Sequence, residues 1–459
     1  MMKTMMRMMM AFAALADVCT VTGVAAEAEV FPSRQVWQYA PVERPVEGFD
    51  PIDISETLHG PWLTMPREDS MRVTWIGRSI CGGGVEYREK GAEEWTTAWD
   101  IRSGLIDCSR DLHSVELRGL KPGTAYEYRL CAVNGEGMSA YTQVYHNPTV
   151  RTFRTLDPGR SAYRVFLASD THGCANMNFA HMYAKSGAKD ADFYFFLGDI
   201  VNDGVYNDIR FYVTRGFLDE VSRLWGGERP TVFMRGNHDL NGQDAYRWSE
   251  YFPQSDGKTY QAFRQGPALF VALDTMNRSR VPAQDAQHAA YLKEQADWIR
   301  GLRKTELWRT AKFRIVMGHI CPWPDLGSSK LTGPAFTEVF SDETPEGRIH
   351  ALVTGHEHQY YRLNPNSKVL HVANGHGDFN LKKYPSSRYC AKSIPERFPF
   401  VNLILNAHEA MTVDVTAEKL TFRSHRWYME QGGCYDAFEL YPDGTVKEIL
   451  ADSVEVPVK

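Results

Sequence analysis

The chain has 459 residues and a net charge of −6, from 51 Lys and Arg against 57 Asp and Glu side chains. This balance gives no sign of a nucleic-acid-binding surface, because such surfaces concentrate lysine and arginine. With 43% hydrophobic and 24% charged residues, the composition is that of a globular protein, and the length predicts two domains.

Residues 1–26 have the pattern of a signal peptide. Lys3 and Arg7 form a positive start, an apolar stretch spans 8–15, and small residues at 24–26 offer a cleavage site. Asp17 interrupts the apolar pattern. Two alternatives to a cleaved signal peptide therefore stay open: a lipid anchor at Cys19 and a wrongly assigned start of the chain. We expect an exported protein, periplasmic or secreted. No later run is apolar enough to predict a transmembrane segment.

Seven cysteines follow residue 26, and export would permit disulfides between them. Cys81 with Cys108 and Cys390 with Cys434 are candidate pairs, although spacing does not fix the connectivity. The chain has no CxxC spacing, so we expect no zinc site built from cysteines.

Residues 57–156 read as short strands separated by turns. Alternating residues at 71–75, 85–88 and 114–117 predict strands, and the glycines at 82–84 and Pro122-Gly123 predict turns. We therefore expect an all-β sandwich. The stretch 120–129, together with Trp75, resembles a fibronectin type III domain. That resemblance implies a corner hydrogen bond at Tyr126 and a core position for Trp75. Residues 157–159 are the expected linker.

From about residue 160 to 430, strands alternate with helices. Short continuous apolar runs are typical of strands covered on both faces; they lie at 165–168, 193–197, 231–234, 313–317 and 350–354. A helix is predicted to begin near Pro282, with apolar residues at helical spacing: Leu292, Ala296, Ile299 and Leu302. Late strands are expected at 400–405, 411–415 and 420–422. The sequence predicts an α/β domain of two packed sheets with helices outside, followed by a C-terminal segment, 431–459.

Each of the five apolar runs is followed by a polar motif. In chain order these are Asp170-Thr171-His172, Gly198-Asp199, Gly236-Asn237-His238-Asp239, Gly318-His319 and Gly355-His356-Glu357-His358. The carboxyl ends of strands meet at one edge of an α/β sheet, so we expect these donors to converge. Mixed nitrogen and oxygen ligands suit zinc, manganese or iron better than calcium. Two such cations side by side serve the cleavage of phosphate esters.

The residue types also predict roles. Asp199 has two oxygens and can bridge two cations, whereas Asp170 and His172 can hold one from a single turn. His238 is the expected proton donor to the leaving oxygen, with Asp239 or Asp203 orienting its ring. Arg235 either contacts a phosphate oxygen or is a surface residue.

In this order, the motifs resemble those of the calcineurin-like metallophosphoesterase superfamily, over residues 163 to about 425. The resemblance implies a first metal held by Asp170, His172, Asp199 and His358. It implies a second metal held by Asp199, Asn237, His319 and His356. His238 is then the proton donor rather than a ligand.

A β-sandwich in front of such a domain resembles the layout of purple acid phosphatases. That family has a tyrosine three residues after the bridging aspartate, where this chain has Asn202, and a glycine at the position of His172. We therefore expect a colourless enzyme whose metal pair the sequence does not identify. Four histidine ligands would also release metal as pH falls, which makes activity at acid pH doubtful.

The favoured hypothesis is an exported phosphatase that hydrolyses a small phosphate ester. A phosphodiesterase or nucleotidase with the same site is the alternative, and a non-catalytic binding protein on this fold is the competing class. Aromatic residues in the loops at 205–225 and 241–257 either stack on the substrate or pack; they are Tyr206, Tyr212, Tyr246, Trp248 and Tyr251. Trp323 is expected to overhang the site. The sequence does not determine the oligomeric state.

Overall fold

The computed structural model describes residues 54–133, 144–172, 179–201, 217–242, 244–254, 257–275, 282–321, 332–340, 344–356, 358, 360–363, 370–373, 404–405, 409–426 and 433–451. The expected signal peptide lies outside these residues, as do Asn202, Asp203, Trp323 and Cys390.

The N-terminal domain is all β, as predicted. Its strands are β1 (Thr57–Thr64), β2 (Ser70–Glu89), β3 (Thr96–Trp99), β4 (Ile101–Arg102), β5 (Leu105–Ile106), β6 (Arg110–Arg118), β7 (Ala125–Val133), β8 (Val144–His146) and β9 (Arg151–Arg154). The first part of β2 pairs with β1 and β6, and its second part pairs with β3 and β7. One long strand therefore contributes to both layers.

The turn expected at residues 82–84 was wrong, because these glycines lie inside β2. A side chain at Gly83 would meet the His113 ring at 2.4 Å, which explains the glycine without a turn. The two core predictions are confirmed. Lys121 donates its backbone N–H to the Tyr126 hydroxyl at 2.9 Å, and Trp75 is buried.

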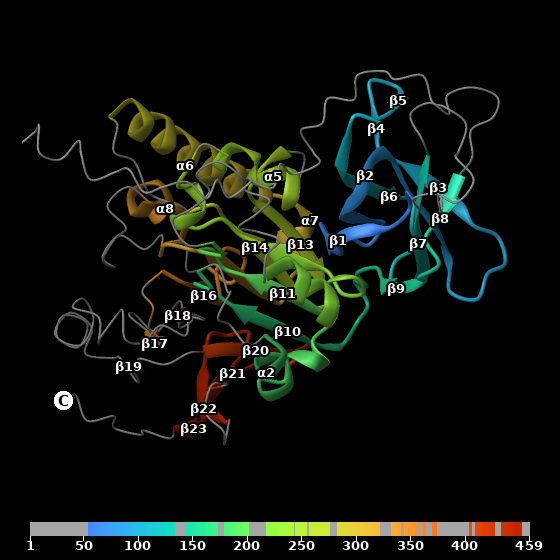
Figure 1. Cartoon of the computed structure of the whole chain (residues 1–459). Helices are drawn as coiled ribbons and strands as arrows, with labels where there is room; N and C mark the ends of the chain where they lie inside the picture. Colours follow the sequence, from blue (N-terminus) through green and yellow to red (C-terminus); the bar gives the residue numbers. More distant parts are fainter. Residues whose placement is uncertain are drawn as a thin grey trace, which may run out of the picture. The chain divides into compact units, whose positions relative to one another are not determined.

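The second domain contains two mixed sheets, as predicted (Figure 1). In the first, the strand order is β12-β11-β10-β20-β21-β22-β23, where β10 is Ala162–Ala168, β11 Phe193–Phe196, β12 Thr231–Phe233, β20 Glu409–Thr416, β21 Leu420–Arg426, β22 Cys434–Leu440 and β23 Val446–Ala451. In the second, the order is β13-β14-β15-β16-β18-β17-β19, where β13 is Gln261–Gln265, β14 Ala268–Ala272, β15 Phe313–Gly318, β16 Ala351–Thr354, β17 Tyr360–Leu363, β18 Leu370–Ala373 and β19 Ile404–Leu405.

Hydrophobic clusters on both faces of the strands account for the unbroken apolar runs. Phe193 and Phe195 of β11 point into a cluster that joins both sheets, with Phe270 and Ile315 from the second sheet. Their neighbours Tyr194 and Phe196 belong to a cluster on the outer face. Successive strand residues face opposite sides, so a strand covered on both faces is apolar throughout.

The longest helix is α6 (Pro282–Leu302), where the sequence predicted it. Its predicted apolar residues are buried against the second sheet: Leu292, Ala296, Ile299 and Leu302. The other helices are α2 (Phe179–Lys185), η3 (Ala188–Asp190), α4 (Asp219–Val221), η5 (Ser222–Gly226), η6 (His238–Leu240), η7 (Ala245–Arg247), α5 (Trp248–Tyr251), α7 (Glu306–Arg309) and α8 (Thr332–Phe340). No helix in the described part is long and apolar enough to cross a membrane.

Two parts of the second domain were not predicted. One is the antiparallel pair β13 and β14, which forms one edge of the second sheet. Residues 434–451, within the predicted C-terminal segment 431–459, form β22 and β23 and extend the first sheet. Phe438 and Leu440 of β22 lie in the cluster between the sheets.

The sandwich shares a core with the second domain. Trp62 of β1 is fully buried and belongs to the same cluster as Tyr251 and Phe252. Its indole N–H donates to the carbonyl oxygen of Tyr251 at 2.8 Å, and the Tyr128 hydroxyl donates to that of Gly227 at 2.5 Å.

The cysteine prediction needs a correction. Cys81 and Cys108 are both free thiols, and so is Cys434.

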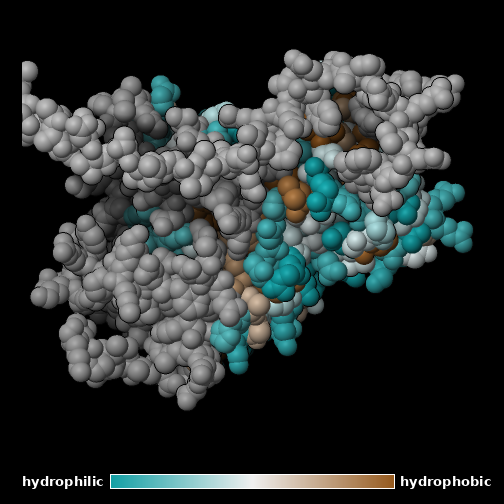
Figure 2. Space-filling model, viewed as in Figure 1, coloured by the Kyte–Doolittle hydropathy of each residue, from teal (hydrophilic) through white to brown (hydrophobic). Residues whose placement is uncertain are grey.

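On the face shown in Figure 2, most of the described surface is hydrophilic, with small hydrophobic patches. The large hydrophobic residues exposed in the described part are Leu58, Ile80, Ile101, Leu105, Val150, Tyr246 and Ile449.

Candidate metal centre

The predicted ligands follow strands of both sheets. Asp170 and His172 follow β10, Asp199 follows β11, and Asn237 follows β12 in the first sheet. In the second sheet, His319 follows β15, while His356 and His358 follow β16. Neighbouring pairs among β10, β11 and β12 are parallel, as are β15 and β16, so the carboxyl ends of the strands in each sheet lie together.

The backbone at these positions has an unusual conformation. Five of the seven non-glycine residues with positive φ in the described chain are predicted ligands: Asp170 (54°), His172 (47°), Asp199 (49°), His356 (73°) and His358 (53°). Residues other than glycine rarely adopt this left-handed backbone conformation, and such strained residues are concentrated at functional sites. At each of these positions, the conformation turns the backbone sharply at the end of the strand.

The glycine before Asn237 is required by close packing. A Cβ atom at Gly236 would lie 2.2 Å from the backbone nitrogen of Asp199 and 2.3 Å from its Oδ1. Only glycine lets the third motif approach the second this closely. The same approach lets His238 donate its backbone N–H to Asp199 Oδ1 at 2.7 Å.

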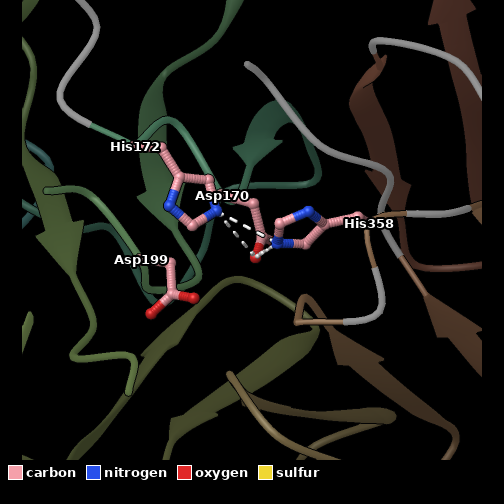
Figure 3. Close-up of side chains that lie close together, drawn as sticks. All are labelled: Asp170, His172, Asp199 and His358. Carbon is pink, nitrogen blue, oxygen red and sulfur yellow. Dashed lines mark hydrogen bonds and ion pairs between the residues drawn. The ribbon is translucent and has the colours of Figure 1, made fainter. Parts of the chain in front are cut away.

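One group of four side chains could hold a metal ion: Asp170, His172, Asp199 and His358. Figure 3 shows them drawn together from three strand ends. His358 Nε2 lies 3.2 Å from Asp170 Oδ1 and 3.0 Å from His172 Nε2. Ser169 donates its hydroxyl to Asp170 Oδ2 at 2.5 Å, and this bond orients the carboxylate.

A second group contains Asp199, His319 and His356. His319 Nε2 lies 3.1 Å from Asp199 Oδ2 and 3.2 Å from the side-chain oxygen of Asn237. His319 Nδ1 is 2.9 Å from the carbonyl oxygen of Leu197, an acceptor that fixes the proton on Nδ1. This leaves Nε2 to face the group. Asp199 is common to both groups.

The charges in the groups favour cations. Burial works to raise the pKa of Asp170, but His319 and His358 hold it well below its usual range. Burial lowers the pKa of His172 and His356 to about 4, so both rings are neutral near pH 7. Two buried carboxylates and neutral imidazoles form an anionic donor set.

His319 and His358 balance that charge in another way. Burial lowers the pKa of His319, but the facing carboxylates of Asp199 and Asp170 raise it to about 9. The carboxylate of Asp170 likewise raises the pKa of His358 against the effect of burial. A proton on His319 Nε2 occupies the lone pair that a metal would take, so metal binding would release it.

One ligand oxygen lacks an aligned hydrogen-bond donor in the described part of the chain. Asp199 Oδ2 is buried, and His319 Nε2 lies 3.1 Å from it, but no donor among the described residues is aligned on it for a hydrogen bond. Such atoms are rare unless an ion or water satisfies them. The residues therefore fit the predicted pair of metal ions, one on each group.

The side chain of His238 lies beside the first group. Its ring centroid is 4.8 Å from that of His172, and its Nε2 is 3.9 Å from Asp199 Oδ2. With 19% of its side chain exposed, His238 is the more accessible partner of this ion pair, since Asp199 is 1% exposed.

Asp239 and Arg235 occupy different positions from those expected. Asp239 accepts the backbone N–H groups of Val201 (3.0 Å) and Gly236 (2.7 Å). Burial and the nearby Asp199 raise its pKa to about 7. The guanidinium of Arg235 is paired with Asp274, through Nε at 3.0 Å and Nη2 at 2.6 Å.

Asp274 was not among the predicted site residues. It follows β14, where the apolar run 268–273 is succeeded by Asp274-Thr275, so the signal was the same as for the five motifs. Of the loop aromatics, Trp248 and Tyr251 are buried and pack, whereas Tyr246 is 77% exposed. Tyr206 and Tyr212 lie outside the described residues.

Comparison with known proteins agrees with this geometry. The family model for the calcineurin-like phosphoesterase matches residues 163–360, and that for the purple acid phosphatase N-terminal domain matches residues 59–149. Two solved structures are similar in fold. The purple acid phosphatase PPD1 from yellow lupin (Lupinus luteus) seeds shares 15% identity over 83% of this chain and 74% of its own (TM-score 0.56). PhoD shares 14% over 87% and 93% (TM-score 0.61).

A curated mouse protein, "Cell adhesion molecule-related/down-regulated by oncogenes", is 33% identical over 91 residues, and its human counterpart is 32% identical. These matches cover 19% of this chain and 7% of the relatives. They carry no activity over to this protein.

The match over residues 163–360 agrees with the fold of this part of the chain and with its two groups of candidate metal ligands. The chain carries a calcineurin-like phosphoesterase domain preceded by a purple acid phosphatase N-terminal domain, and both were expected from the sequence motifs.

Proposed function

We propose that this protein is an exported phosphatase that uses two metal ions to hydrolyse small phosphate monoesters. The observation that carries the proposal is that Asp199 belongs to both groups of candidate ligands. A carboxylate shared between two groups suits a pair of cations about 3.5–4 Å apart. Asn237 would complete the second group through its side-chain oxygen, 3.2 Å from His319 Nε2.

Manganese, zinc and iron all suit this donor set. When bound, the two metals would provide hydroxide near neutral pH and offset the charge on phosphate oxygens. The chain supplies the geometry. Gly236 and the backbone N–H of His238 fix Asp199, and Ser169 fixes Asp170.

His238 is the proposed proton donor. It lies next to Asn237 in sequence, faces the first group and is partly exposed. From there, a proton on Nε2 can pass to the oxygen of the leaving alcohol as the bond to phosphorus breaks. Asp239 would act on this turn through the backbone, because its carboxylate holds Val201 and Gly236. We assign Arg235 no contact with phosphate, because Asp274 engages its guanidinium.

Hydrolysis of p-nitrophenyl phosphate and bis-p-nitrophenyl phosphate, with manganese or zinc added, tests the proposal. We expect the monoester to be cleaved faster and metal analysis to find two ions per chain. If neither ester is cleaved with any divalent metal and the protein binds none, the enzyme proposal fails.

A nucleotide is the second candidate substrate, and one observation favours it. Tyr246 is 77% exposed on η7, which lies beside the His238 turn, η6. An exposed aromatic ring can stack on a base. Faster turnover of nucleoside monophosphates than of sugar phosphates, lost in Tyr246→Ala but kept in Tyr246→Phe, would support a nucleotidase.

Export and the domain division are also part of the proposal. Residues 1–26 have the pattern of a cleaved signal peptide. We place a fibronectin type III-like sandwich at 57–156 and a catalytic domain that begins at 160 and includes β22 and β23, because these strands extend its first sheet. The hydrogen bond of Tyr126 to Lys121 supports the fibronectin resemblance. Mass spectrometry of the protein recovered outside the cytoplasm should show a mature N-terminus after Ala26.

A further inference from the structure

An ion pair between partly exposed Arg235 and fully buried Asp274 joins the two sheets beside the second group of ligands. Asp274 follows β14 of the second sheet and is fully buried, while Arg235 follows β12 of the first sheet. Both Nε and Nη2 of Arg235 donate to Asp274 Oδ2, at 3.0 and 2.6 Å. Thr259 donates its hydroxyl to the same oxygen.

The aspartate is held rigidly. Gln295 of α6 accepts the backbone N–H of Asp274 at 2.9 Å and donates its side-chain amide to the Asp274 carbonyl oxygen at 3.0 Å. These bonds hold the backbone of Asp274 in place, so its carboxylate keeps a fixed position opposite Arg235.

The pair connects to two proposed metal ligands from different sheets. Arg235 lies two residues before Asn237. On the other side, Leu273 donates its backbone N–H to the carbonyl oxygen of Met317 at 2.8 Å, and Met317 lies two residues before His319.

Contact between the two ligands closes this path into a ring. Asn237 Oδ1 lies 3.2 Å from His319 Nε2. The distance between ligands from separate sheets therefore depends on a link between those sheets at the same edge, and the Arg235–Asp274 pair is such a link.

We propose that the Arg235–Asp274 pair is a positioning element that sets the spacing of Asn237 and His319 for the second metal. This rests on the proposed function. Arg235 would act through Asp274 and not on the phosphate, because both of its donors named above point to the aspartate. Loss of a group that orients metal ligands typically changes metal affinity 10- to 100-fold.

Titration of Mn²⁺ into the metal-free full chain by calorimetry tests the role directly. We expect Asp274→Asn and Arg235→Gln each to weaken the second Mn²⁺ by at least roughly tenfold and to leave the first unchanged. The double variant should bind no more weakly than either single one, because the two residues act as one unit. Arg235→Lys keeps the charge but not the two-pronged geometry, so it should fall between wild type and Arg235→Gln.

A matched control comes from the sandwich domain. Asp100 pairs with Arg110 at 2.8 Å and is similarly buried. Asp100→Asn should lower the melting temperature without changing either Mn²⁺ affinity. Circular dichroism on every variant separates unfolding from a local change, and Arg235→Lys remains informative if Asp274→Asn does not fold.

Two results would overturn the proposal. Wild-type affinity for both Mn²⁺ ions in folded Asp274→Asn would remove the positioning role. A raised KM for p-nitrophenyl phosphate in Arg235→Gln, with normal Mn²⁺ binding and a normal KM in Asp274→Asn, would show a phosphate contact instead. In both cases, two Mn²⁺ ions and hydrolysis in the wild type would leave the proposed function standing.

Discussion

The contact between the sandwich and the catalytic domain gives a prediction whose size follows from burial. Trp62 is fully buried, its indole N–H donates to Tyr251 O at 2.8 Å, and it shares a cluster with Phe252. Replacing a buried tryptophan with alanine costs about 3–5 kcal/mol. Losing one neutral hydrogen bond costs only about 1 kcal/mol. Trp62→Ala should therefore lower the free energy of unfolding by about 3–5 kcal/mol, and Trp62→Phe by much less.

Urea unfolding, followed by circular dichroism and by loss of p-nitrophenyl phosphate hydrolysis, measures this effect. The ring centroids of Phe252 and Phe233 are 4.4 Å apart, and Phe233 is the last residue of β12, the strand before Asn237. We therefore expect the two signals to shift together in Trp62→Ala. Trp95→Ala is the control, because Trp95 is only half-buried, with Arg88 4.2 Å from its ring, and should cost about 1 kcal/mol.

Two separate transitions in Trp62→Ala, with hydrolysis lost at the same urea concentration as in the wild type, would refute this reasoning. The sandwich would then be an attached module that does not support the site.

Three further predictions concern the site and pH. His238→Ala should keep two Mn²⁺ ions while turnover falls by at least about a hundredfold; loss of metal would instead make His238 a ligand. Asp199→Asn should lose metal and activity together, and metal analysis that finds two ions would contradict its bridging role. Burial lowers the pKa of His350 from 6.5 to about 4. Its folded pKa is the lower one, so stability is lost as pH falls from about 7 towards 4. Between pH 8 and 5 this amounts to about 2 kcal/mol. His350→Gln should flatten the metal-free unfolding curve against pH by that amount, and an unchanged slope would refute it.

The candidate ligands could be predicted because their signals are local. Each apolar run, such as 193–197, ends in a polar motif, and parallel strands bring such ends together. The positive φ of Asp170 and Asp199 was not foreseen, but the strand-to-turn change that requires it was visible in the sequence. The helix from Pro282 to Leu302 followed from its spacing of apolar residues.

What could not be predicted depends on contacts distant in sequence. Arg235 and Asp274 are 39 residues apart, and nothing near either residue reveals the other. The glycines at 82–84 predicted a turn, yet packing against His113 explains Gly83 inside a continuous strand. Likewise, β22 extends the first sheet because Phe438 fills the space between the sheets, which pattern alone does not show.

The central claim is that two metal ions share Asp199, and anomalous diffraction from crystals grown with Mn²⁺ tests it most directly. We predict two peaks about 3.5–4 Å apart. One should lie on the group of Asp170, His172 and His358, the other on that of His319 and His356, with Asp199 contacting both. A single peak, or two peaks that do not both contact Asp199, would contradict the account.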